Sequence, residues 1–176
     1  HNLREVIEAA VFLIENPDAN VGQLLKFIKG PDFPLGGKVL ASRKTLRQIY
    51  EQGHGTIKVQ AEWKIEQVGR RKQIVITSIP YGVNKAALEE HIGRLIAERK
   101  LPQVLNIVNE SSAKEGIRVV LELRGDADPE MVMAYLYKHT ALQENFAYNM
   151  TCLVPVRLAG SDLPGQSVTA LRPKRL

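Results

Sequence analysis

The stretch TIKVQAEWKIEQVGRRKQIVITSIP, residues Thr56 to Pro80, contains the clearest folding signal of the chain. Apolar and polar residues alternate from Thr56 to Glu66, a period that is typical of a strand with one buried face. The apolar run from Lys72 to Pro80 is the expected partner strand, and the connector QVGRRK places basic residues at the turn. The sequence therefore predicts an antiparallel hairpin with a basic tip.

The order of elements after this hairpin predicts the rest of the fold. Helical spacing of apolar residues runs from Lys85 to Arg99 after Asn84, and a second helix is expected to start at Pro129 with Asp128 as its N-cap. The segments VLNIVNES, GIRVVLEL and YNMTCLVPV are expected strands. From the second hairpin strand onward the order is strand, helix, strand, strand, helix, strand, the split βαβ pattern of ferredoxin-like units. We therefore predict an α+β fold with such a unit over residues 73–156.

The sequence before this unit predicts a helical lead-in. Apolar residues recur at helical spacing over residues 1–30, on both sides of an Asn-Pro-Asp break. Residues 31–72 hold the first strands, a short helix from Thr45 to Gln52, and the basic hairpin. Pro31 and Pro34 restrict the backbone between the lead-in and the first strand. Residues 157–176 lack periodicity and are rich in Gly, Pro and Ser, so we expect a linker toward a further segment.

Composition and motifs exclude several classes of protein. With 176 residues, of which 44% are hydrophobic, the chain can bury a core. No apolar run approaches the roughly 18 residues of a membrane span and no signal peptide opens the chain, so we predict a cytoplasmic protein. The single cysteine, Cys152, lies in an apolar run and is expected to be a core thiol. The four histidines fall in separate elements, and no metal site is predicted.

No arrangement of residues predicts catalysis. A Gly-rich phosphate loop between a strand and a helix is absent, and Ser111 and Ser112 lack the sharp turn that presents a nucleophile. The charge pattern is more informative, because basic residues concentrate in the first half of a chain whose formal net charge is +5. An anionic partner is expected to bind there. The basic residues are Arg43, Lys44, Arg47, Lys58, Arg70, Arg71 and Lys72.

Five motifs, in order, resemble one known family. They are GPDFPLGG, IYEQGHGTIKVQAEWKIE, ITSIPYGVNKAALEEHIGRLI, NESSAKEGIRVVLEL and YKHTALQENFAYNM. In this order they resemble successive motifs of the A subunit of bacterial type IIA DNA topoisomerases. Within that family, SRKTLRQIYEQG and AEWKIE are more similar to the A subunit of topoisomerase IV than to that of DNA gyrase.

The resemblance implies that residues 1–156 are the tower domain, which lies between a winged-helix domain and a long coiled-coil arm and holds flanking duplex DNA. The whole enzyme cuts one duplex, passes another through the gap using ATP, and reseals it. It contains an A-subunit homodimer together with B subunits, which bind Mg²⁺ and ATP. The active-site tyrosine belongs to an Arg-Tyr-Thr motif that this sequence lacks. The chain alone is therefore expected to be inactive and to bind no cofactor and no membrane.

One departure from the family pattern adds a candidate residue. Where the family usually has a basic Gly-Arg-Gly turn, this chain has Gly53-His54-Gly55, so a phosphate contact by His54 should be weaker or pH-dependent. The alternative to a topoisomerase tower is a stand-alone ferredoxin-like nucleic-acid-binding or regulatory module. An RNA-recognition sheet presents aromatic residues on its central strands, and VLNIVNES and GIRVVLEL contain none. A small metabolic enzyme would need convergent polar residues, which the sequence does not indicate.

Overall fold

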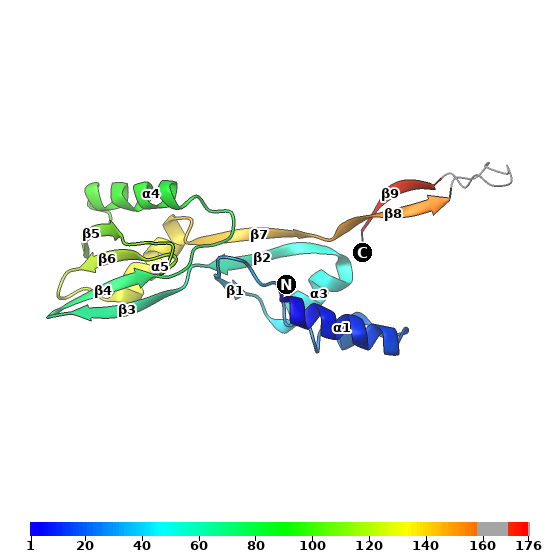
Figure 1. The fold of residues 1–176 in the computed structure, drawn as a ribbon. Helices are drawn as coiled ribbons and strands as arrows, with labels where there is room; N and C mark the ends of the chain where they lie inside the picture. The colour runs from blue at the N-terminus through cyan, green and yellow to red at the C-terminus, as the bar shows by residue number, and fades with distance from the viewer. Residues whose placement is uncertain (158–168, 176) are drawn as a thin grey trace. The chain divides into compact units, whose positions relative to one another are not determined.

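The computed structural model describes residues 1–157 and 169–175, with side chains described as far as Leu153 (Figure 1). The chain forms two compact units, each made of segments that are separated in sequence. The sheet unit comprises His1–Asn2, Pro31–Leu40 and Lys58–Phe146. The helical unit comprises Leu3–Gly30, Ala41–Ile57 and the described residues from Ala147 onward.

A four-stranded antiparallel sheet forms the body of the sheet unit. Its strands are β3 (Trp63–Val68), β4 (Arg71–Ile76), β6 (Val119–Leu123) and β5 (Val104–Asn109), in that spatial order. The predicted hairpin is confirmed, because β3 pairs with β4 from Trp63 opposite Ile76 to Val68 opposite Arg71. Gly69 in the turn has φ +61°, a conformation that glycine adopts without the steric cost of a side chain.

Two helices bury one face of this sheet. They are α4 (Lys85–Ala97) and α5 (Pro129–His139), and their caps are the predicted ones: Asn84 accepts a hydrogen bond from Ala87 N, and Asp128 accepts one from Glu130 N. The helices and the sheet share one apolar core. Its fully buried residues include Ile74 and Leu121 from the strands and Ile92 and Leu136 from the helices.

The α+β fold is confirmed, with one difference in strand placement. The β4-β6-β5 order is that of a split βαβ unit, in which the third strand lies between the first two. The edge position beside the first strand belongs to β3, whereas the predicted last strand, residues 148–156, is divided between two elements outside this sheet. They are the end of β7 (Gln143–Asn149), which lies in a second sheet of order β1-β2-β7, and β8 (Thr151–Arg157), which lies in a two-stranded sheet. The other strands of the β1-β2-β7 sheet are β1 (Lys38–Leu40) and β2 (His54–Gln60).

The single strand predicted from Thr56 to Glu66 is therefore two strands in two sheets. The chain changes sheets at Ala61 and Glu62, whose N–H groups donate to Leu142 O (2.7 Å) and Ser78 Oγ (2.9 Å). Burial continues to alternate as far as Ala61, at the end of β2. The backbone partners change while the sequence pattern persists, so the pattern did not reveal the break.

The helical unit contains α1 (Leu3–Glu15), α2 (Val21–Leu24) and α3 (Arg43–Gln52). Helix α3 begins two residues before the predicted start, because Ser42 Oγ accepts a hydrogen bond from Thr45 N and caps it. It ends at Gly53 in the left-handed conformation. Among the described residues, no helix combines the length and the apolar character needed to cross a membrane.

The segment predicted as a linker contains a strand, β9 (Thr169–Arg175), which pairs along its length with β8 (Thr151–Arg157). Arg157 of that segment ends β8, and residues 158–168 and 176 lie outside the described residues. Cys152 was expected in the core but is half-buried, and its neighbours Thr151 and Leu153 are exposed. The difference arises because β8 belongs to a two-stranded sheet and not to the large sheet with its helices.

Candidate nucleic-acid interface

The basic tip of the β3–β4 hairpin extends beyond its sheet. Strand β6 pairs with β4 only from Gln73 to Ile76, so Arg71 and Lys72 lie past the end of this pairing, next to Arg70 in the turn. All three side chains are exposed, and none forms an ion pair within the described part of the chain. The tip therefore presents three positive charges without counter-charges.

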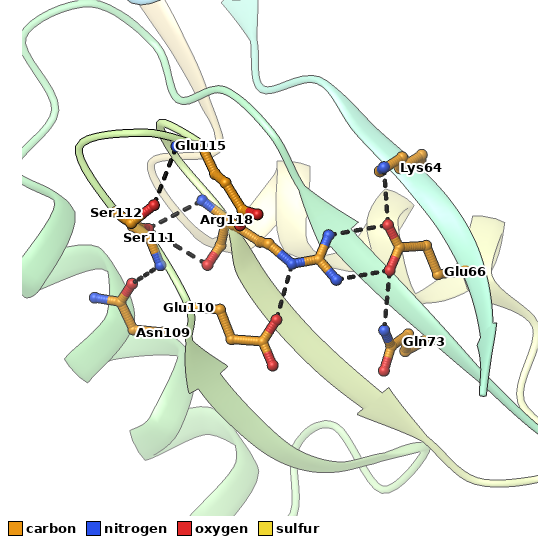
Figure 2. A network of polar contacts seen from close by, with 9 residues as sticks. All are labelled: Lys64, Glu66, Gln73, Asn109, Glu110, Ser111, Ser112, Glu115 and Arg118. Carbon is orange, nitrogen blue, oxygen red and sulfur yellow. Dashed lines mark hydrogen bonds and ion pairs between the residues drawn. The ribbon is translucent and has the colours of Figure 1, made fainter.

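A network of charged side chains anchors the strand that carries this tip (Figure 2). Arg118, just before β6, donates from both terminal guanidinium nitrogens to the two carboxylate oxygens of Glu66 on β3, at 2.9 and 2.7 Å. Its Nε donates to Glu110 at 2.8 Å. Lys64 and Gln73 also contact the Glu66 carboxylate, at 2.8 and 3.2 Å. The edge strand β3 is thus connected to β6 across β4.

The electrostatics of this network favour its charged form. Hydrogen bonds from Arg118 and then Lys64 hold the pKa of the Glu66 carboxyl well below its usual range. Hydrogen bonds to Glu66 and Glu110 raise the pKa of Arg118. A paired guanidinium and carboxylate at bidentate distance form one of the stronger polar contacts of proteins. The network therefore keeps β3 in register near neutral pH.

The network lies on the sheet face opposite the helices. Val75 and Val120, directly opposite each other on this face, are 0% and 3% exposed although they do not belong to the core under the helices. Lys64 and Arg118, which lie on this face, are both paired with carboxylates. Strands β4 and β6 present no aromatic residue on this face, so it lacks the stacking platform of RNA-recognition sheets.

Lys58 lies on an exposed face of the second sheet, beside a lysine that the sequence analysis missed. Leu40 is opposite Lys58, and Lys38 is opposite Gln60, so Lys38 and Lys58 are diagonal neighbours on one face. Both are exposed, and neither forms an ion pair among the described residues. Three-residue strands are too short for alternation to predict which side chains share a face.

The segment that leads into β1 is held tightly within the sheet unit. The ring of Phe33 stacks on Tyr81, with centroids 5.7 Å apart, and meets Phe146 edge to face at 5.0 Å. Gly37 has φ +101°, and a Cβ there would lie 3.0 Å from Val59 Cγ1. Pro31 and Pro34 therefore act together with the aromatic packing of Phe33 and the close approach of Gly37 to Val59. Together they position β1 and Lys38.

Three further candidates, Arg43, Lys44 and Arg47, lie on α3 in the helical unit. Arg43 and Lys44 occupy the first helical turn, which contains no acidic residue. Positive charges there oppose the helix dipole, an arrangement that typically costs about 0.3–1 kcal/mol for each exposed charge. Arg47 donates to Glu51 at 2.7 Å and is the only one of the seven predicted basic residues with an ion pair among the described residues. Unfavourable arrangements of this kind, such as positive charges at a helix N-terminus, are found more often at functional surfaces than elsewhere.

His54 projects from a rigid turn. Gly53 accepts a hydrogen bond from Met150 N at 2.7 Å, and a Cβ at Gly55 would lie 2.5 Å from Ile49 Cγ1. The His54 side chain is exposed. The backbone on both sides is therefore restrained while the imidazole is accessible.

The eight predicted residues thus fall into two groups. Lys58 and the hairpin tip belong to the sheet unit, and His54 belongs to the helical unit with the three α3 residues. Every member is exposed. The arrangement suits contacts with a polyanion through charge rather than chemistry at a reaction centre. Within residues 1–157 and 169–175, no three His, Cys, Asp or Glu side chains are grouped so that they could hold a metal ion.

Comparisons with known proteins agree with the motifs. The sequence model of the family of DNA gyrase and topoisomerase IV A subunits matches residues 1–159. The DNA gyrase A subunit of Thermotoga maritima is 44% identical over 150 residues, covering 85% of this chain and 18% of the relative. The DNA topoisomerase 4 A subunit of Streptococcus pneumoniae serotype 4 is 40% identical over 154 residues, covering 87% and 18%. The chain spans about a fifth of the length of the curated relatives it matches.

Proposed function

The chain belongs to the family of DNA gyrase and topoisomerase IV A subunits, and on that premise we propose that it is the tower that holds flanking duplex DNA in a type IIA topoisomerase. The observation that carries the proposal is the set of exposed basic residues on rigid elements. Six of the seven form no ion pair among the described residues. Cations that have no carboxylate partner are available to phosphates.

Such a surface binds DNA without reading its sequence. Contacts from Lys and Arg to phosphates position a duplex but carry no base information. Each neutralised phosphate releases counterions, so affinity falls as salt rises. A tower that holds whichever duplex is being cut needs this kind of binding, because the flanking sequence differs from one cut to the next.

The parent enzyme is proposed to change DNA topology by cutting one duplex, passing another through it and resealing the cut with the use of ATP. In that scheme the A subunits form a homodimer, the B subunits bind Mg²⁺ and ATP, and the complex acts in the cytoplasm. In this scheme the described chain positions the DNA and does not itself cut or reseal it. Mixed with supercoiled plasmid, Mg²⁺, ATP and a B subunit, it should relax no DNA, and relaxation that survives repeated purification would contradict this assignment.

Within the family we propose that the parent protein is a topoisomerase IV component, on the motifs SRKTLRQIYEQG and AEWKIE. Relatives of both kinds fall between 39% and 44% identity, so overall similarity does not separate them. Reconstitution of the parent A subunit with each kind of B subunit tests the subtype. Strand passage with the topoisomerase IV partner alone is the expected result, and strand passage with the gyrase partner alone would overturn it.

The DNA-binding proposal itself is tested by measuring fluorescence anisotropy of two labelled duplexes of unrelated sequence. The chain should bind both with equal affinity, and the logarithm of affinity should fall linearly with the logarithm of salt concentration. A strong preference for one duplex, or binding that does not respond to salt, would refute it.

A further inference from the structure

A small hollow in the helical unit is lined by basic residues that come from two segments of the chain and not from α3 alone. Its volume is about 90 Å³, and it lies between the segment that follows α2 and the start of α3. Its lining residues are Leu25, Lys26, Ile28, Lys29, Arg43 and Leu46. Three of them are cations, three are aliphatic, and none is acidic.

The cations of this hollow have little compensation. Lys26 and Arg43 are exposed and form no ion pair with any carboxylate among the described residues. Lys29 Nζ lies 3.6 Å from Glu5 Oε1, but the lysine side chain is 79% exposed while that of Glu5 is 18% exposed, so solvent screens the lysine and the pair offsets its charge only in part. Three positive charges around one small hollow repel one another unless an anion binds between them.

The aliphatic residues of the hollow indicate which kind of anion it can bind. Leu46 is 9% exposed, and Leu25 and Ile28 are half-buried, so they form an apolar surface inside the ring of cations. A free inorganic anion would contact the cations and leave that surface in water. The deoxyribose-phosphate unit of a DNA strand has an apolar sugar face next to its charge, and it suits both parts of the hollow.

We propose that this hollow binds one sugar-phosphate unit of a duplex, with the sugar against Leu25, Ile28 and Leu46 and the phosphate between the cations. Lys26 and Lys29 thereby join Arg43 in the DNA-binding surface, although no signal in the sequence placed them near it. The inference rests on the proposed function and adds a defined contact to it.

The test compares two double variants with equal loss of charge. Lys26→Gln with Arg43→Gln removes the two unpaired cations of the hollow and leaves the Lys29–Glu5 pair intact. Lys114→Gln with Lys138→Gln is the control, because both residues are exposed, lack an ion pair among the described residues and belong to the sheet unit. Thermal unfolding first establishes that both variants fold. Salt titrations with a duplex then give the slope of log affinity against log salt.

The hollow variant should lower this slope by about 0.9, since the hollow binds one phosphate and each phosphate contact contributes about 0.9, and the control should leave it unchanged. A second readout is the shift of the methyl NMR signals of Leu25, Ile28 and Leu46 on addition of duplex to the wild-type chain. Inorganic phosphate at matched ionic strength should not reproduce these shifts.

The outcomes separate this inference from the function on which it rests. If the wild-type chain binds no duplex, the proposed function fails and the inference fails with it. If the chain binds duplex while the hollow methyl signals stay still and the slope of the hollow variant equals that of the control, the inference alone is wrong. Methyl shifts produced equally by inorganic phosphate would identify an anion site without a role for the sugar, and would also refute it.

Discussion

Neutralising the hairpin tip should weaken DNA binding in proportion to the number of phosphates that the tip neutralises. The variant Arg70→Gln, Arg71→Gln, Lys72→Gln removes three cations that extend beyond the β6 pairing and have no ion pair among the described residues. At about 0.9 per phosphate, the slope of log affinity against log salt should fall by up to about 2.7. Between about 50 and 200 mM salt, a roughly fourfold change, wild-type affinity should then drop about 40-fold more than that of the variant.

The assay is fluorescence anisotropy with two duplexes of unrelated sequence over a series of salt concentrations. The charge-matched control is Arg99→Gln, Lys114→Gln, Lys138→Gln, because these residues are exposed, unpaired among the described residues and outside both basic groups. The loss of affinity should be the same for both duplexes, because phosphate contacts carry no sequence information. A hairpin variant that keeps the wild-type slope, or that loses no more than the control, would remove the tip from the DNA surface.

Three further outcomes are expected. Gly55→Ala should lower the free energy of unfolding in denaturant by about 1–3 kcal/mol, because the alanine Cβ would lie 2.5 Å from Ile49 Cγ1. The control is Gly125→Ala, where a Cβ meets nothing within 4 Å, and it should change the free energy of unfolding by no more than about 0.5 kcal/mol. Because the pKa of Glu66 is lowered in the folded chain, its stabilising effect is present above the usual carboxyl range and is lost as pH falls. The stability difference between wild type and Glu66→Gln should therefore be constant near pH 7 and shrink below about pH 4, and a difference independent of pH would contradict the role of Arg118. His54→Arg should strengthen duplex binding if residues 53–55 lie against a phosphate, because arginine carries a permanent positive charge, and unchanged affinity would separate this position from the DNA surface.

The fold could be predicted where the residues that form a helix or strand also show its pattern in the sequence. The hairpin has alternation on its first strand, an apolar run on its second strand and a glycine in its turn, and the helices α4 and α5 have side-chain caps one residue before their starts. The break at Ala61 could not be predicted, because its cause is a hydrogen bond to Leu142, distant in sequence, while the alternation continues through it. Pairing of β9 with β8 was hidden for a similar reason, since a strand in a two-stranded sheet does not require alternating burial.

The candidate surface was predictable in part. Clusters of basic residues adjacent in sequence, such as the hairpin tip, can be recognised by composition alone. Lys26 and Lys38 are single lysines whose neighbours, Arg43 and Lys58, come from other elements, so only the tertiary structure brings them together. Arg118 and Glu66 are 52 positions apart, and no spacing rule links them.

The central claim is that this domain holds the duplex that flanks the cut. Hydroxyl-radical footprinting of the parent A and B subunits on a DNA fragment with one strong cleavage site tests it most directly, by comparing the wild-type enzyme with the variant neutralised at Arg70, Arg71 and Lys72. We expect protection of the central segment to be unchanged and protection of the flanking arms to shorten on both sides. An unchanged footprint in the neutralised enzyme would contradict it.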